Sequence, residues 1–84
     1  MRKLSMHLGG ALMTWNYRII RDEHEQFNIH EVYYNVNGDP TAWSVDPISP
    51  GGETPGDLYI DLRMMTKAVD RPVLHIVDEK LVQW

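Results

Sequence analysis

The segment "FNIHEVYYNVNGDPTAWSV", residues 27–45, predicts the centre of a β-sheet, because it has two strand patterns on either side of an Asn-Gly turn. Residues 27–34 are rich in aromatic and β-branched side chains, and residues 41–45 have the same character over a shorter length. Between them Gly38 follows Asn37, and this dipeptide is a strong signal for a hairpin. The sequence therefore predicts two neighbouring antiparallel strands.

Two registers are compatible with this turn. A two-residue loop at 37–38 pairs Val32 with Trp43 across the hairpin. A three-residue loop at 36–38 instead pairs Glu31 with Trp43. Asn at the first turn position and Gly at the fourth favour a type I turn and hence the longer loop, which we predict. This register also gathers more apolar side chains on the helix side of the sheet, namely Phe27, Ile29, Tyr33, Trp43 and Val45.

The segments around this hairpin add strands on both sides. "TWNYRIIR", residues 14–21, has the composition of a strand and is followed by a polar turn at 22–26. Residues 46–56 contain three prolines and three glycines, which predict a loop. The apolar run at 73–77 fits a short last strand.

The segment "TPGDLYIDLRMMTKAVD", residues 54–70, carries the clearest helix signal. Thr54 is a favourable N-cap, Pro55 suits the first helical position, and Pro72 prevents any continuation. Apolar residues at i, i+4, i+7 and i+11 predict the face that packs on the sheet: Leu58, Leu62, Met65 and Val69. The predicted fold class is α+β, with a three-stranded antiparallel meander, one helix packed on the sheet and a short C-terminal strand (β-β-β-α-β).

The composition excludes several classes of protein. A chain of 84 residues is sufficient for one domain, and the absence of cysteine excludes disulfides and thiolate metal sites. A formal charge of -4 with scattered Lys and Arg argues against a nucleic-acid partner. No apolar run approaches the roughly 18 residues of a membrane span. We expect a cytoplasmic protein.

The N-terminal residues 1–12 are expected to form a flexible tail before a single α+β domain at 13–84. The stretch superficially resembles a signal peptide, but His7 and the glycines at 9–10 interrupt its apolar part, and no cleavage site follows. Met13 stands directly before the first strand pattern. We therefore expect Met13 to be the natural start of the protein.

Glu31 is the strongest candidate for a functional residue. The predicted three-residue loop places its carboxylate among aromatic side chains on the helix side of the sheet, with His30 on the opposite face. An apolar setting would raise its pKa and suit acid–base chemistry. Pairing with an arginine such as Arg21 or Arg63 would instead make it structural, and we favour that role, so no catalytic residue is assigned. Whether the protein is an enzyme stays open. The candidate binding residues are Glu31, His30, Tyr33 and Trp43.

Other polar constellations are weaker. Three histidines and three glutamates match no metal-binding spacing: His24, His30, His75, Glu23, Glu25 and Glu31. Asp57 is explained by helix capping and Asp61 by exposure to solvent. The glycine-rich residues 50–54 lack the lysine of a phosphate-binding loop. We expect neither a metal nor a cofactor.

Apolar residues outside the predicted core predict an interaction surface. They exceed what one helix-covered sheet face can bury, and a contiguous exposed patch marks an interaction site. We expect a protein partner or a second copy to bind the C-terminal segment or the uncovered sheet face. The candidate interface residues are Ile60, Met64, Leu74, Ile76 and Trp84.

The segments "MTWNYRII", "IHEVYYN", "NGDPTAWS", "GET" and "PVL" resemble a family of small bacterial proteins without an established activity. This resemblance covers residues 13–75 and carries over no catalytic residue. Residues 46–58, "DPISPGGETPGDL", together with the element order are more distantly similar to HicB-type antitoxin domains. That second resemblance implies a small sheet domain that binds a toxin protein.

Overall fold

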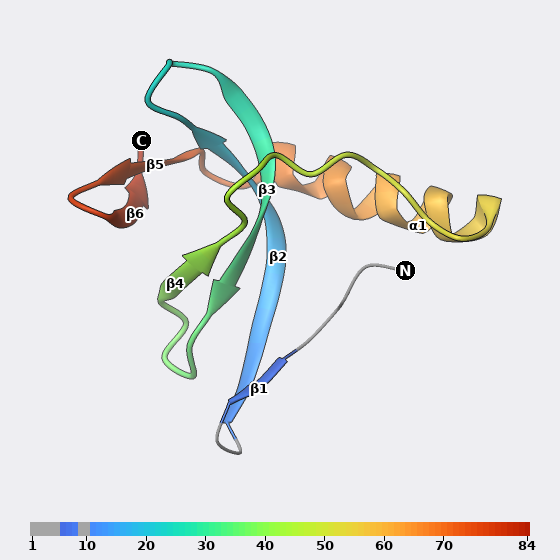
Figure 1. Cartoon of the computed structure of the whole chain (residues 1–84), viewed down its shortest axis with the longest axis horizontal. Helices are drawn as coiled ribbons and strands as arrows, with labels where there is room; N and C mark the ends of the chain where they lie inside the picture. Colours follow the sequence, from blue (N-terminus) through green and yellow to red (C-terminus); the bar gives the residue numbers. More distant parts are fainter. Residues whose placement is uncertain (1–5, 9–10) are drawn as a thin grey trace.

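The computed structural model describes residues 6–8 and 11–84 and is an α+β fold with one mixed sheet and one α-helix (Figure 1). The elements are β1 (Met6–Leu8), β2 (Ala11–Arg21), β3 (Phe27–Tyr34), β4 (Pro40–Trp43), α1 (Pro55–Thr66), the 3-10 turn η1 (Lys67–Asp70), β5 (Leu74–Val77) and β6 (Lys80–Gln83). The meander β2-β3-β4 and the helix are therefore confirmed.

The strand order of the sheet, β4-β3-β2-β5-β6, differs from the prediction. β5 lies parallel to β2, with Ile20 opposite Leu74, and β6 returns antiparallel to β5. The predicted β-β-β-α-β order missed β6, because its turn Asp78-Glu79 lacks the Asn or Gly typical of such hairpins. Both residues adopt positive φ angles of 51° and 64°. The sheet therefore ends in a second hairpin at the C-terminus.

Both faces of the sheet carry a hydrophobic core. The face away from the helix holds Ile20, Val32, Leu74 and Leu81, with Tyr34 and Trp43 packed against them. The helix face holds Tyr17, Met65 and Ala68, with Trp15, Ile19, Ile29, Ile48 and Met64 around them. β4 and β6 stand at opposite ends of the strand order and yet contact each other. The sheet is therefore strongly curved.

The β3–β4 hairpin combines the two registers that the sequence allowed. Next to the turn, the Asn35 amide donates to the Asp39 carbonyl and Gly38 adopts φ 83°, which is the predicted three-residue loop. A β-bulge between Tyr33 and Tyr34 then shifts the pairing by one residue. Beyond it Val32 lies opposite Trp43, so the predicted pairing of Glu31 with Trp43 was wrong. Trp43 therefore packs on the face away from the helix.

Helix α1 begins as predicted, with the Thr54 hydroxyl accepting a hydrogen bond from the Asp57 amide at 3.0 Å. Its predicted buried face was wrong, except for Met65. The residues that face the protein are Asp61, Met65 and Ala68, whereas the exposed fractions are 38% for Leu58, 44% for Leu62 and 67% for Val69. Asp61 was predicted to be exposed, and it is buried.

The geometry of the helix explains this difference. The C-terminal end of α1 and η1 pack on β2, and the first half of the helix extends past the sheet (Figure 1). Within the described part of the chain, the connection from β4 runs beside that projecting half and is held by a hydrogen bond from the Gly51 amide to Asp61. Periodicity shows that a helix has an apolar stripe, but it does not show what lies against the stripe.

The predicted tail at residues 1–12 and domain at 13–84 stay a prediction, and only part of that tail is described. The backbone of β1 pairs with the start of β2, with Met6 opposite Met13, so residues 6–8 of the predicted tail form a strand. Residues 1–5 and 9–10 lie outside the described residues. The boundary at Met13 stays a prediction. No helix in the described part of the chain is long and apolar enough to cross a membrane.

Candidate functional site

The helix face of the sheet contains a buried cluster of two carboxylates and two phenols. The Tyr17 hydroxyl donates to Oδ1 of Asp61 at 2.5 Å, and the Gly51 amide donates to Oδ2 of the same carboxylate at 2.9 Å. Tyr17 lies directly opposite Glu31 in the β2–β3 register, so their side chains share this face. The Tyr33 hydroxyl donates to Oε1 of Glu31. Tyr17, Glu31, Tyr33 and Asp61 form what we call the carboxylate cluster.

The position of Glu31 on the helix side is confirmed, and both carboxylates of the cluster are buried. The arginines considered as structural partners of Glu31 lie elsewhere. Arg21 is bonded to Glu25 at 2.9 Å, and the Arg63 guanidinium lies 5.7 Å from the centre of the Tyr59 ring. Phenolic donors therefore satisfy carboxylate oxygens here, which agrees with a structural role.

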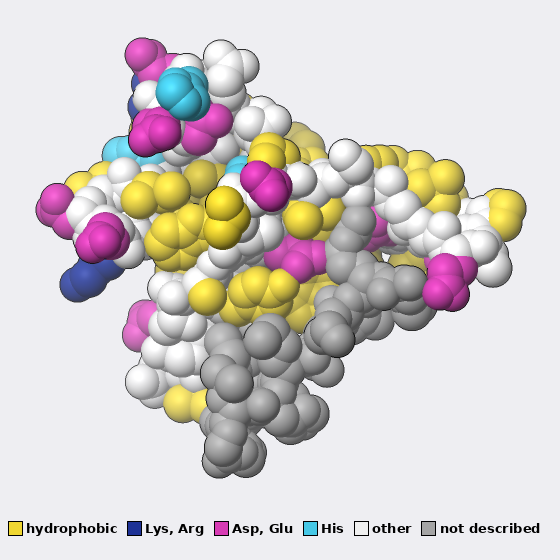
Figure 2. All heavy atoms as spheres, in the orientation of Figure 1, with side chains coloured by type: hydrophobic (Ala, Val, Ile, Leu, Met, Phe, Trp, Pro, Cys, Tyr) yellow, Lys and Arg dark blue, Asp and Glu magenta, His cyan; other side chains and the backbone are white. Residues whose placement is uncertain are grey.

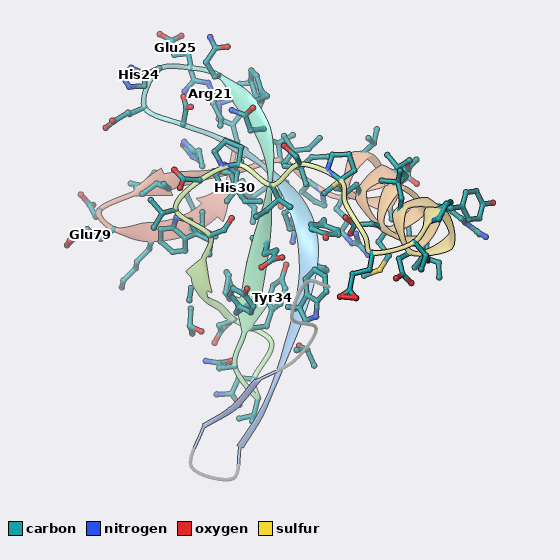
Figure 3. All side chains as sticks on the ribbon, turned by 45° about the vertical axis from the view of Figure 1, so that its right-hand side comes forward. Arg21, His24, Glu25, His30, Tyr34 and Glu79 are labelled. Atoms are coloured by element: carbon teal, nitrogen blue, oxygen red, sulfur yellow. The ribbon has the colours of Figure 1, made fainter. Side chains whose placement is uncertain are left out.

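The opposite face carries a separate polar network. Nδ1 of the buried His30 donates to the Ser44 carbonyl oxygen at 2.9 Å. Arg18 donates to the Tyr34 hydroxyl at 2.9 Å, and that hydroxyl donates to Oδ1 of Asn16 at 2.7 Å. Figure 3 shows His30 within the sheet and His24 at the distant β2–β3 turn. These bonds fix the His30 ring and Tyr34 in place.

The four candidate binding residues are consequently split between two faces. Glu31 and Tyr33 lie on the helix face, whereas His30 and Trp43 belong to the other face. The sheet itself separates the two pairs, so the structure does not bring them into one site. Within residues 14–84, no group of three or more His, Asp or Glu side chains is arranged to hold a metal ion.

The candidate interface residues also divide. Ile60, Ile76 and Trp84 are exposed, whereas Leu74 is buried in the core and Met64 packs beside Tyr17 and Met65. Trp84 contacts other side chains, with its ring 5.1 Å from that of Phe27 and 5.5 Å from the Arg21 guanidinium. The predicted surface is therefore not one continuous patch.

Sequence reasoning missed that most of the predicted buried face of the helix is exposed. Leu58 and Leu62 of α1 and Val69 of η1, here called the α1 stripe, are exposed and flank the buried Met65. Figure 2 shows hydrophobic atoms at the surface over α1. The signal for this stripe was present in the 4-3-4 spacing, but it was interpreted as the contact with the sheet.

No family model, curated protein or solved structure matches this chain.

Proposed function

We propose that this protein is a protein-interaction module, and that its docking surface is the α1 stripe, covered in solution by the α1 stripe of a second copy. The observation that carries this proposal is the exposure of Leu58 and Leu62 on a well-capped helix and of Val69 in the 3-10 turn that follows it. A helix normally buries its apolar stripe, and an exposed contiguous patch is typical of an interaction surface.

The spacing of the stripe supports a helix as the occupant. The exposed Leu58 and Leu62 lie four residues apart on one face of α1, a spacing that recurs in the seam between two paired helices. A helix of 12 residues gains little stability without tertiary packing. Among the described residues, the connection from β4 lies beside the half of α1 that extends past the sheet, and Leu58 and Leu62 stay exposed on this helix (Figure 1).

The charges of the helix support a second copy in antiparallel orientation. Asp57 lies in the first turn and Arg63 lies in the last turn. Antiparallel pairing about a two-fold axis places the acidic start of each helix beside the basic end of the other, and it also opposes the two helix dipoles. Such a contact uses the same patch on both copies, as two-fold symmetric dimers do. Two-fold pairing therefore places opposite charges next to each other at both ends of the contact.

Sedimentation equilibrium between about 1 and about 100 μM tests this proposal, because a standard interface gives a dissociation constant in or below this range. We expect a dimer for the natural sequence and a monomer for Leu62→Glu, since the variant places a charge at the centre of the contact. The matched control is Val45→Glu, which makes the same kind of change at a residue that is 92% exposed and lies outside α1. This control should remain a dimer.

Two results would overturn the proposal. One is a natural chain that stays monomeric over the whole range, and the other is a Leu62→Glu variant that remains as dimeric as Val45→Glu. Either result would favour the alternative of a small-molecule-binding protein or enzyme around Glu31. The resemblance to HicB-type antitoxins predicts a different protein partner and stays a prediction.

A further inference from the structure

A pocket of about 170 Å³ lies between β2 and the end of the helix, and no residue of the α1 stripe lines it. Its lining residues are Trp15, Asn16, Tyr17, Met64, Lys67 and Arg71. It combines two cationic side chains with two aromatic rings in a chain whose formal charge is -4. We call it the β2–η1 pocket.

The two cations of this pocket are available to a ligand. Among residues 14–84, the ion pairs are Arg21 with Glu25 and His24 with Glu23, and neither involves Lys67 or Arg71. Nη1 of Arg71 donates to the Tyr17 carbonyl at 3.3 Å, which holds the guanidinium beside the strand. The remaining N–H groups of a positioned guanidinium match the two oxygens of a carboxylate.

The walls of the pocket are apolar and well supported. The Trp15 and Tyr17 rings meet edge to face, 5.0 Å apart at an interplanar angle of 89°. Tyr17 is fully buried and is held by its bond to Asp61, so the aromatic wall has a fixed position. Met64 provides a second, adaptable apolar side. This combination suits a ligand in which a flat apolar group lies next to a carboxylate.

The position of the pocket favours a singly charged anion. η1 directly continues α1, and the carbonyl groups at a helix C-terminus carry partial negative charge that opposes an anion. The positive charges of Arg71 and Lys67 compensate the repulsion from these carbonyl groups more readily for an anion with one negative charge than for an anion with two. We propose that the β2–η1 pocket binds a small monocarboxylate that carries a flat apolar group, with the carboxylate on Arg71 and Lys67 and the apolar group against Trp15.

The test is a titration of the uniformly ¹⁵N-labelled full chain with benzoate, followed by two-dimensional NMR. Benzamide has the same shape without the charge, and inorganic phosphate has charge without the ring. We expect saturable benzoate shifts at the Trp15 indole and the Arg71 amide, with benzamide and phosphate each at least about tenfold weaker. Arg71→Gln and Lys67→Gln should each weaken benzoate by about tenfold. The exposed Lys67 provides a test that does not depend on the folding of the Arg71 variant.

Arg63→Gln is the matched control, because Arg63 lies on the same helix against Tyr59 and outside the pocket. Its benzoate affinity should stay within about twofold of the natural chain. The proposal is overturned by shifts that do not saturate, by shifts centred elsewhere, by benzamide or phosphate binding as tightly as benzoate, or by equal losses in the Lys67 and Arg63 variants. Because the pocket and the α1 stripe share no residue, a monomeric chain would leave this result unaffected.

Discussion

The hydroxyl of Tyr17 in β2 donates a 2.5 Å hydrogen bond to Asp61 in α1, joining residues 44 positions apart. The other oxygen of Asp61 accepts from the Gly51 amide at 2.9 Å. One buried carboxylate thus connects the sheet, the projecting helix and the loop that runs beside it. Disrupting this carboxylate should loosen all three segments together.

We expect Tyr17→Phe to lower the free energy of unfolding by about 1–3 kcal/mol, because it removes a donor from a buried carboxylate. A double-mutant cycle with Asp61→Ala in urea unfolding should give a coupling energy of about 1–2 kcal/mol. Tyr59→Phe is the control, since Tyr59 is 60% exposed, and should change the stability by less than about 0.5 kcal/mol. Additive effects of the two variants would contradict the contact.

Gly52 is packed against the first turn of α1. A Cβ added there would lie 2.5 Å from the Asp57 Cβ and 2.7 Å from the Leu58 amide nitrogen. Gly52→Ala should therefore destabilise the protein by about 1–3 kcal/mol in thermal or urea unfolding. Gly56→Ala makes the same change inside the helix, where the nearest atom is 3.7 Å away, and should stabilise by about 0.5–1 kcal/mol. Equal effects of both variants would show that the loop is not packed on the helix.

Glu79 occupies the second central position of the β5–β6 turn at φ 64°, at the exposed tip of the hairpin (Figure 3). A side chain in this left-handed conformation is strained, whereas glycine adopts it freely. We expect Glu79→Gly to stabilise the protein by about 0.5–1 kcal/mol, measured by thermal unfolding. Glu23→Gly, at an exposed position without a positive φ, should not stabilise it. A less stable Glu79→Gly protein would argue against this turn.

Asp22 makes stability depend on pH. The hydrogen bond from the Gln26 amide to its carboxylate lowers the pKa of Asp22 below 3.8. Partial desolvation opposes this shift, while the His24 amide and the charges of His24 and His30 add to it. Because the folded-state pKa is depressed, the contribution is present above pH 3.8 and is lost as pH falls through the folded-state value.

The measurement is the free energy of unfolding of the natural chain and of Asp22→Asn at a series of pH values from neutral to strongly acidic. Asn keeps an oxygen that accepts the same amide bonds but carries no charge. We expect the natural chain to lose more stability than the variant as the pH falls below 3.8. Parallel curves for the two proteins would contradict the predicted shift.

Features that depend on neighbouring residues were predicted correctly from the sequence, whereas features that depend on distant residues were not. The strand at 27–34, the Thr54 cap and the three-residue turn ending in Gly38 were all predictable, because each depends on a few neighbouring residues. The partner of Trp43 was not predictable, because a β-bulge between Tyr33 and Tyr34 shifts the register by one residue beyond the turn. The side of Glu31 was still predicted correctly, since β3 alternates without interruption.

The candidate site follows the same division. The residue pattern was enough to predict an amphipathic helix, and the spacing of Leu58, Leu62 and Val69 identified its apolar stripe. The burial of Asp61 and Ala68 against the sheet follows from tertiary packing, because the helix packs through its C-terminal end and extends past the strands. Periodicity is a property of one segment. Burial depends on where the rest of the chain places its surfaces, and the sum of those contacts outweighs the preference of any single helix face.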